Sequence, residues 1–284
     1  VLAAINASLT YQRNKIWKDD YTLWADCLKK SPNKARVNNG FGLALFEKGR
    51  LEEAVHYYNK AIFIKPDYAD AFNNRGAAYN GLVQYQLAIE DLNKAIRLEP
   101  ASFQAYNNLG NTYNTLGQYQ RALSYYNEAI RLQPNYADAY NNRGTLYGKM
   151  GQYQLAITDF NKAIILKPDY ALAYYNTGFA YSFTGQHERS AEYYNKAIHL
   201  KQNYTDAYYQ RGLAYARLGH YQKAAEDLNK TIMLMPNHAE VYQNRAFVYL
   251  KQGKKDLGCS DAKKACDLGN CKTLESLKNM GVCR

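Results

Sequence analysis

Residues 103–136 read FQAYNNLGNTYNTLGQYQRALSYYNEAIRLQPNY, and residues 137–170 repeat the pattern as ADAYNNRGTLYGKMGQYQLAITDFNKAIILKPDY. Both stretches place glycine at their eighth and fifteenth positions and proline at their thirty-second. All six prolines of the chain lie on the same 34-residue grid, at Pro32, Pro66, Pro100, Pro134, Pro168 and Pro236. A fixed period of this size indicates an array of stacked units.

Seven consecutive units follow this grid: 35–68, 69–102, 103–136, 137–170, 171–204, 205–238 and 239–272. In most units the first segment has apolar or small residues at positions four, eight and eleven, the spacing of one helical face. We call the predicted first helix of a unit helix A and the second helix B. Glycine at position eight is expected to face small residues at positions twenty and twenty-seven of helix B. Glycine at position fifteen is expected to end helix A in a left-handed conformation.

Proline at position thirty-two is expected to end helix B, because it cannot continue a helix. An Asp or Asn follows it in most units and is predicted to be the N-cap of the next helix A. These candidates are Asp67, Asn135, Asp169, Asn203 and Asn237. An acidic residue three positions further on, as at Asp70, has the spacing of a capping box.

The recurring pattern of Gly at eight, Tyr at eleven, Ala at twenty, Phe or Tyr at twenty-four, Ala at twenty-seven and Pro at thirty-two resembles the tetratricopeptide repeat. The resemblance covers Ala35 to about Lys272, with local departures at Ser190, Thr231 and Gly258. It implies an all-α fold, a right-handed superhelix of helix pairs whose A helices line a concave groove. Residues 1–34 are interpreted as a degenerate N-terminal repeat and residues 271–284 as a C-terminal capping helix.

The N-terminal region resembles a second family. The stretch RNKIW at 13–17, Leu23-Trp24 and the run SPNKARV at 31–37 are similar to the junction in membrane proteins that join a sugar-transferase domain to such repeats. Transmembrane, tetratricopeptide-containing O-mannosyltransferases and their bacterial relatives belong to that group. The resemblance implies that Val1 to Thr10 lies at or just beyond a membrane-spanning helix. The alternative is that this segment is a worn helix A.

Composition and charge favour a binding protein over an enzyme or a nucleic-acid-binding protein. Hydrophobic residues are 47% and charged residues 21% of the 284 residues, an ordinary globular balance. The five histidines form no ligand-spaced pair and no phosphate-binding loop occurs, so we expect no metal, no cofactor and no catalytic site. Much of the net charge of +11 lies at the two ends, whereas a nucleic-acid groove is basic along its length.

Arginine at position seven always occurs together with aspartate at position twenty-three. A buried arginine is tolerated only when it is paired. We therefore predict four ion pairs between helices: Arg75 with Asp91, Arg143 with Asp159, Arg211 with Asp227, and Arg245 with Asp261. The alternative is that a two-repeat unit was copied without any such contact.

Four of the five cysteines lie in the last 26 residues. If two antiparallel helices meet there, Cys266 faces Cys271 and Cys259 approaches Cys283. We predict disulfides between those pairs, one of three connectivities that four cysteines allow. They would argue for an extracytoplasmic compartment, on the periplasmic side of a bacterial membrane. The alternative is four reduced cysteines, which leaves a cytoplasmic location open.

Position six carries a row of carboxamides: Asn74, Asn108, Asn142, Asn176, Gln210 and Asn244. Positions five and nine add Asn73, Asn107, Asn141 and Asn111. Helical spacing places positions two, five, six, nine, twelve and thirteen opposite the buried face of helix A. The row resembles the asparagine ladder by which the O-linked N-acetylglucosamine transferase holds peptide backbones, because a carboxamide offers both donors and an acceptor. The alternative is a purely structural ladder in which these side chains bond to one another.

These observations predict a non-catalytic scaffold that binds protein or extended peptide in its concave groove. The alternative function is a regulatory or substrate-presenting domain of a membrane-embedded glycosyltransferase. Membrane anchoring upstream of Val1 and self-association through the ends of the superhelix are further expectations. No nucleic-acid partner is expected.

Overall fold

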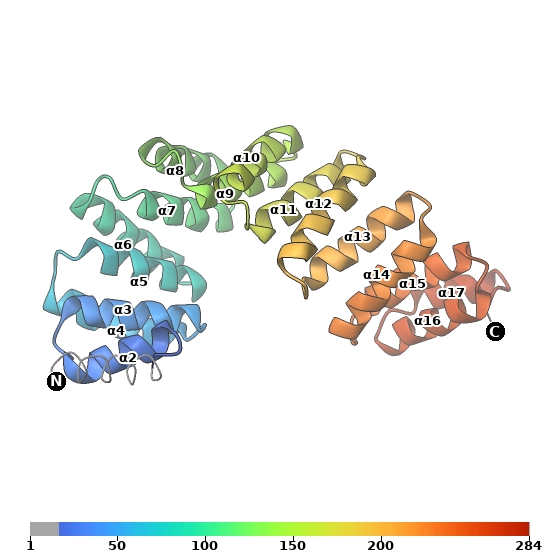
Figure 1. Cartoon of the computed structure of the whole chain (residues 1–284), viewed down its shortest axis with the longest axis horizontal. Helices are drawn as coiled ribbons and strands as arrows, with labels where there is room; N and C mark the ends of the chain where they lie inside the picture. The colour runs from blue at the N-terminus through green and yellow to red at the C-terminus, as the bar shows by residue number, and fades with distance from the viewer. Residues whose placement is uncertain (1–16, 284) are drawn as a thin grey trace, which may run out of the picture. The chain divides into compact units, whose positions relative to one another are not determined.

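The computed structural model describes residues 17–283, and all of the regular structure in that range is helical, in sixteen helices (Figure 1). The A helices are α3 (Ala35–Glu47), α5 (Ala69–Gly81), α7 (Phe103–Thr115), α9 (Ala137–Lys149), α11 (Ala171–Phe183), α13 (Thr205–Arg217) and α15 (Ala239–Lys251). The B helices are α4 (Leu51–Ile64), α6 (Tyr85–Leu98), α8 (Tyr119–Leu132), α10 (Tyr153–Leu166), α12 (His187–Leu200), α14 (Tyr221–Leu234) and α16 (Lys255–Asp267). The predicted all-α class is confirmed.

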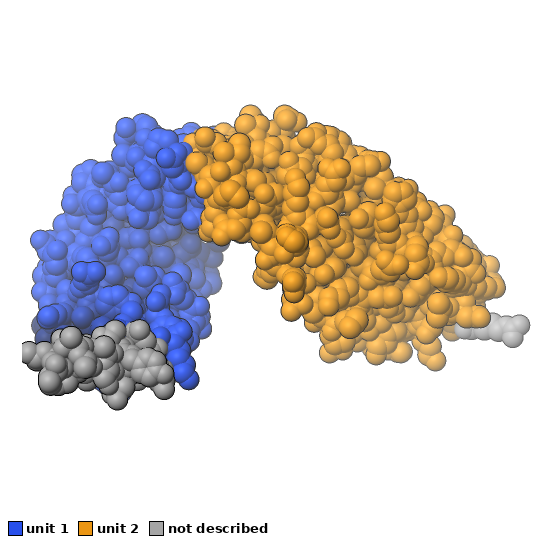
Figure 2. All heavy atoms as spheres, viewed as in Figure 1, with its two compact units in different colours: residues 1–139 blue, residues 140–284 orange. Residues whose placement is uncertain are grey.

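The chain divides into two compact units, residues 1–139 and 140–284, which Figure 2 colours separately. Within each unit a helix A packs against its own helix B, as α5 does against α6 and α13 against α14, and a helix B packs against the next helix A, as α4 does against α5 and α12 against α13. Consecutive A helices also touch, as α5 touches α7 and α11 touches α13. Each repeat therefore buries its apolar face only against its neighbours, as expected of a stacked array.

The glycine at position fifteen ends helix A as predicted. Gly49, Gly117, Gly151, Gly185, Gly219 and Gly253 all have φ between 73° and 76°. Val83 occupies the same position in the second repeat and has φ of 63°. A β-branched residue is strained in this left-handed region, so Val83 is a local weak point.

The glycine at position eight faces position twenty of helix B, as expected: a Cβ added at Gly144 would lie 3.2 Å from the carbonyl oxygen of Ala156. The side chain at position twenty-four lies closer still. A Cβ added at Gly110 would lie 2.5 Å from the ring of Tyr126, and one added at Gly144 would lie 2.7 Å from the ring of Phe160. The small residues at positions twenty and twenty-seven let helix B approach. The bulky side chain between them, at position twenty-four, packs directly against the glycine.

The predicted N-caps are wrong. The N-cap residue of helix A lies one position after the predicted one, as at Tyr68, Tyr170 and Tyr204. None of these three side chains makes a capping hydrogen bond. The Tyr68 N–H donates to the carbonyl of Lys65 at 3.2 Å, which closes a turn with Asp67 inside it. Asp67 therefore stands one residue too early to cap the helix. The aromatic side chains at the true N-cap position pack in the core instead, as the stacking of Tyr175 on Tyr204 illustrates.

The N-terminal repeat is represented by α2 (Asp20–Lys30), which takes the place of a helix B. The ring of Trp24 covers Gly40 so closely that a Cβ there would lie 2.6 Å from it. The expectations for Val1 to Thr10 and for the start of the RNKIW stretch lie outside the described residues. Within the described part, no helix is both long and apolar enough to cross a membrane.

The C-terminal cap is α17 (Lys272–Asn279), which packs on α16. Cys259 is bonded to Cys283 and Cys266 to Cys271, the connectivity expected from the sequence. Leu277 and Cys283 pack with Ala246 and Ala262 in a small core. The two disulfides therefore hold α17 over the end of the last repeat.

Candidate functional site

A hydrogen-bonded carboxamide ladder joins consecutive A helices. The Nδ2 of Asn74 donates to Oδ1 of Asn39 at 3.2 Å, and Asn108 donates to Asn73 at 2.9 Å. In the second unit Asn176 donates to Asn141 at 2.9 Å. Each bond runs from position six of one repeat to position five of the repeat before it. The structural ladder that the sequence left open is therefore present in both units.

The ladder corrects the predicted placement of position five on the open groove surface. Asn107 is 4% exposed and Asn141 is 2% exposed. Asn141 accepts from Asn176 on α11, so its side chain faces the A helix of the next repeat rather than solvent. Asn73 is half-buried, and its Oδ1 is occupied by Asn108. The asparagines at position five thus align the repeats and are not directly open to a ligand.

Position six remains half-buried at Asn74, Asn108, Asn142, Asn176, Gln210 and Asn244. Each ladder bond uses one of the two N–H groups of a carboxamide. Asn108 and Asn176 thereby keep Oδ1 as an acceptor, whereas Oδ1 of Asn74 accepts from Asn73 at 3.2 Å. Asn244 donates to the hydroxyl of Tyr209 at 2.8 Å. We call the surface formed by positions six, nine and thirteen the A-helix face.

Asn111 is oriented by a buried tyrosine. The Tyr126 hydroxyl, on helix B of the same repeat, donates to Oδ1 of Asn111 at 2.8 Å. Because Oδ1 is held by the tyrosine, the Nδ2 group of Asn111 is the end left for another partner. Residues equivalent to Asn111 are Leu43 in the first repeat and Phe179 in the fifth. There the buried hydroxyls of Tyr58 and Tyr194 have no hydrogen-bond partner among the described residues.

The structure brings together all four of the predicted arginine and aspartate pairs. Each guanidinium donates from Nε and Nη2 to the two carboxylate oxygens, at distances of 2.6 to 2.8 Å. The aspartates are buried, with exposed fractions of 5–7%. Two-point contacts of this kind are among the strongest charge-assisted bonds.

The arginines also connect neighbouring repeats. Nη1 of Arg211 donates to Oδ1 of Asn195, on helix B of the preceding repeat, at 2.7 Å. Arg75 and Arg245 make the same contact with Asn59 and Asn229 at 2.6 Å. Burial lowers the pKa of Arg211, but its bonds to Asp227 outweigh that effect and the net pKa is raised. The guanidinium therefore stays charged.

Aromatic rings enclose each of these guanidinium groups. Arg211 lies 5.5 Å from the ring centroid of Tyr208 and 5.8 Å from that of Tyr215, one helical turn to either side. Repeats without the pair use another contact. In the fifth repeat Tyr193 replaces the aspartate, and its hydroxyl donates to Asn161 of the preceding repeat at 3.3 Å.

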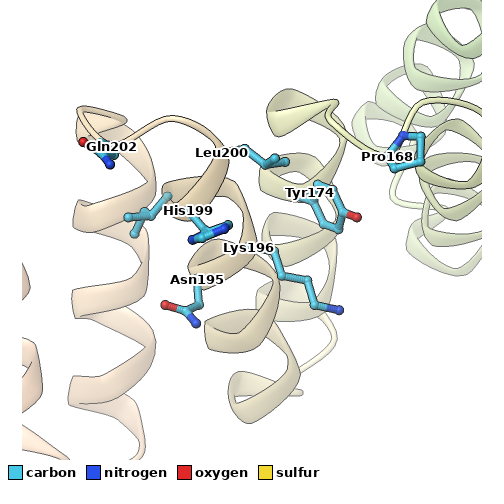
Figure 3. Close-up of a pocket in the computed structure, with 8 residues that line it drawn as sticks. Pro168, Tyr174, Asn195, Lys196, His199, Leu200 and Gln202 are labelled. Carbon is cyan, nitrogen blue, oxygen red and sulfur yellow. The ribbon is translucent and has the colours of Figure 1, made fainter.

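A pocket of about 640 Å³ lies away from the A-helix face, beside the end of α12 (Figure 3). It is lined by Tyr174, Lys196 and His199, and by Gln202 at the grid position that carries proline in the other repeats. Lys196 lies 5.1 Å from the ring centroid of Tyr193. Asn195 in this pocket already accepts a bond from Arg211. The pocket therefore includes a structural contact between two repeats. Among the described residues no cluster of His, Cys, Asp and Glu could hold a metal ion.

Comparisons with known proteins agree on the repeat type. Family models described as TPR repeat match residues 42–82, 84–117, 110–151 and 184–219. Models described as tetratricopeptide repeat match residues 137–170 and 205–238. These matches cover more than half of the chain.

Among curated proteins, the chain is 33% identical over 85 residues to the protein O-mannosyl-transferase Tmtc3 of Drosophila melanogaster. The match covers 30% of this chain and only 9% of that protein. Among solved structures, the chain resembles one chain of the APC/C hetero-tetramer Cut9-Hcn1, with a TM-score of 0.73, 19% identity, and coverage of 92% of this chain and 51% of that one. It also resembles the TPR protein YrrB, with a TM-score of 0.59 and 24% identity; the match covers 66% of this chain and 97% of that one. At these identities the two structures establish a common fold.

Proposed function

The chain belongs to the tetratricopeptide repeat family, and from that premise we propose that it is a non-catalytic scaffold that holds an extended peptide on its A-helix face. The observation that carries the proposal is the fixed orientation of Asn108 and Asn111. Oδ1 of Asn73 accepts from Nδ2 of Asn108, and the Tyr126 hydroxyl donates to Oδ1 of Asn111. One carboxamide therefore offers an acceptor and the other a donor.

The two groups match the chemistry of a peptide backbone. Asn108 and Asn111 are three residues apart on α7, so they are neighbours on one helical face. An extended peptide presents an N–H and a C=O in every residue. Oδ1 of Asn108 would accept from the N–H, and Nδ2 of Asn111 would donate to the C=O. Neither contact depends on the peptide side chains, so the face would bind many sequences.

The test uses peptides selected from a displayed library of random twelve-residue sequences on the intact chain. The variant Asn111→Leu removes the proposed donor and leaves the bond between Asn108 and Asn73 in place. The first repeat already has Leu43 with Tyr58 in this arrangement, so the variant has a precedent in the same chain. Because a net hydrogen bond contributes about 0.5–1.5 kcal/mol, we expect the affinity to fall by about two- to tenfold.

The matched control is Asn135→Leu, which changes an exposed asparagine in the turn after α8 of the same repeat. It should leave the affinity unchanged. Equal affinities for the parent chain, Asn111→Leu and Asn135→Leu in fluorescence polarisation would refute the proposed contact.

A second candidate function rests on the match to an O-mannosyl-transferase. On this proposal the repeats are the substrate-presenting or regulatory domain of a membrane-embedded glycosyltransferase, whose catalytic residues lie outside this chain. The discriminating observation is whether the gene encodes several membrane-spanning helices joined to the repeats. If it encodes none, the simple scaffold is favoured.

We also propose an extracytoplasmic location. Its support is the pair of disulfides at the C-terminus, because disulfides persist in oxidising compartments. Thiol labelling of the protein in intact cells, before lysis, tests the proposal. Labelling of all five cysteines in the denatured protein would place it in a reducing compartment.

A further inference from the structure

The A-helix face of the second unit contains a hollow that the carboxamide ladder does not explain. A pocket of about 470 Å³ lies between α9 and α11 and reaches α10, and its volume falls within the range typical of ligand sites. Gly148, Tyr153, Phe179 and Phe183 line it. Apart from the contributions of α10, its lining comes mainly from positions five, six, nine, twelve and thirteen of two neighbouring A helices.

Gly148 lines the hollow and has no side chain to occupy it. A Cβ added at Gly148 would meet no atom within 4 Å. The same position carries Phe46 in the first repeat and Leu250 in the last. Gly148 lies inside a helix and has no positive φ, so neither a turn nor a close helix contact requires glycine there. In the interior of a helix, glycine lowers helix stability by about 1 kcal/mol relative to alanine. At Gly148 the missing side chain leaves open space.

Aromatic rings form the walls of the hollow and remain partly exposed. Phe179 is 38% exposed and Phe183 is 57% exposed. Their ring centroids lie 4.8 Å apart, and the ring of Tyr153 stacks on Phe183 at 5.1 Å. The fifth repeat is the only one of the seven with phenylalanine at both positions nine and thirteen. Such rings provide flat faces on which another aromatic ring can stack.

A backbone-binding group stands at the edge of the same hollow. Asn176 lines the pocket and donates Nδ2 to Asn141, which leaves its Oδ1 as an acceptor. The Thr145 hydroxyl is already committed to the carbonyl of Asn141 at 2.9 Å. Asn176 therefore repeats the arrangement of Asn108 and lines the same pocket as the aromatic rings.

Positive charge flanks the hollow. Position thirteen carries Lys149 and Arg217 in the repeats on either side of Phe183. In the first unit the same position carries Glu47, Gly81 and Thr115. Both basic residues are exposed, so a peptide with carboxylates beside its anchoring residue would be attracted to this part of the face.

We propose that this hollow, the aromatic pocket, binds the aromatic side chain of an extended peptide whose neighbouring residues are acidic. The inference rests on the proposed function, because Asn176 would hold the backbone while the pocket selects the side chain. The aromatic pocket would make binding depend on the peptide sequence, whereas the carboxamides of the A-helix face would contact only the peptide backbone.

The test is the same selection of displayed twelve-residue peptides, performed in parallel on the parent chain and on Gly148→Leu. A Cβ at this position meets no atom within 4 Å, so a leucine side chain can extend into the hollow, and leucine favours the helix more than glycine does. We expect aromatic residues next to Asp or Glu to be enriched on the parent chain and not on Gly148→Leu. Replacing the selected aromatic residue by alanine should weaken binding to the parent chain by about tenfold and leave binding to Gly148→Leu nearly unchanged.

Phe63→Ala is the matched control, because Phe63 is an exposed phenylalanine on α4, a helix B, and lies outside both the A-helix face and the pocket. Its selected peptides should match those of the parent chain. Binders that depend on Asn111 but show no aromatic enrichment, or an enrichment that survives Gly148→Leu, would refute the aromatic pocket and leave the scaffold function standing. A library without binders would overturn both.

Discussion

Arg211 donates two parallel hydrogen bonds to Asp227, at 2.8 and 2.7 Å, between the two helices of one repeat. The same guanidinium donates to Asn195 in the repeat before it. One side chain therefore links helix A to its own helix B and to the preceding repeat. In a stacked array, where each repeat contacts only its neighbours, such a link bears directly on stability.

Removing one partner of this pair is expected to be costly. Asp227→Ala would leave the guanidinium of Arg211 largely buried without its carboxylate. Breaking a buried ion pair in this way typically costs about 3–5 kcal/mol. We expect a loss of this size in the free energy of unfolding, measured by urea denaturation followed by circular dichroism.

The control replaces both partners with residues from another repeat of the same chain. Arg211→Leu with Asp227→Tyr copies Leu109 and Tyr125 of the third repeat. The double variant should recover most of the stability lost in Asp227→Ala. If the double variant is less stable than Asp227→Ala, the ion pair stabilises the fold by more than the free energy that burying its two charges costs.

Val83 offers a stabilising change. It has φ of 63°, whereas glycine has φ of 73° to 76° at the same position in the other six repeats. The left-handed conformation costs a non-glycine residue about 1–2 kcal/mol. Since Val83 is 67% exposed, Val83→Gly loses little packing and should raise the free energy of unfolding by about 1 kcal/mol. The reverse change, Gly117→Val, should lower it, and opposite signs in urea unfolding would disprove the assignment.

Buried tyrosines predict a loss of stability at alkaline pH. Burial raises the pKa of Tyr136, Tyr175 and Tyr204 to about 12, whereas tyrosine in an unfolded chain titrates near pH 10. Above about pH 10 the unfolded chain loses protons that the folded chain keeps, so the free energy of unfolding falls as pH rises towards 12. Below pH 10 this contribution is fully present.

Urea unfolding at pH 8, 10 and 11 measures the slope. Tyr136→Phe keeps the ring that packs against Phe103 and removes the ionisable hydroxyl. In this variant the free energy of unfolding should fall less between pH 10 and 11 than in the parent chain. An unchanged slope would mean that the Tyr136 hydroxyl does not contribute.

The C-terminal disulfides predict one free thiol, that of Cys27, in the denatured and unreduced protein. Reduction should destabilise the cap over α16 by about 2–4 kcal/mol, because a loop of 24 residues is released in the unfolded chain. Titration with a thiol reagent and thermal unfolding with and without dithiothreitol provide the measurements. Cys27→Ser should leave the melting temperature unchanged, and five free thiols would contradict the assignment.

The repeat positions and the four ion pairs could be predicted from the sequence because each is copied several times. Arg75 with Asp91 and Arg211 with Asp227 obey one contact rule, so coincidence was an unlikely explanation. The cysteine pairing was also accessible, since a short turn at Gly269 brings two helices together. Features that repeat, or that involve near neighbours in the chain, leave a readable pattern.

Features that depend on packing between repeats were harder to predict. The A-helix spacing alone placed Asn141 on the open face, but the neighbouring repeat buries it. Asp67 has the residue type of an N-cap, yet it lies inside the turn that the Tyr68 N–H closes with Lys65, and the helix starts one residue later. The aromatic pocket was missed because it needs Gly148 and Phe183 together, and these belong to different repeats. A comparison of position twelve with position thirteen of the next unit could have found it.

The most direct test of the central claim asks which surface touches the peptide. A photoreactive residue is placed on the A-helix face by Thr115→p-benzoylphenylalanine, and on helix B of the same repeat by Arg131→p-benzoylphenylalanine; both positions are exposed. After irradiation with a selected peptide, mass spectrometry should find a covalent adduct with the variant at position 115 and none with the variant at position 131. An adduct at position 131 alone, or equal yields from both, would contradict binding on the A-helix face.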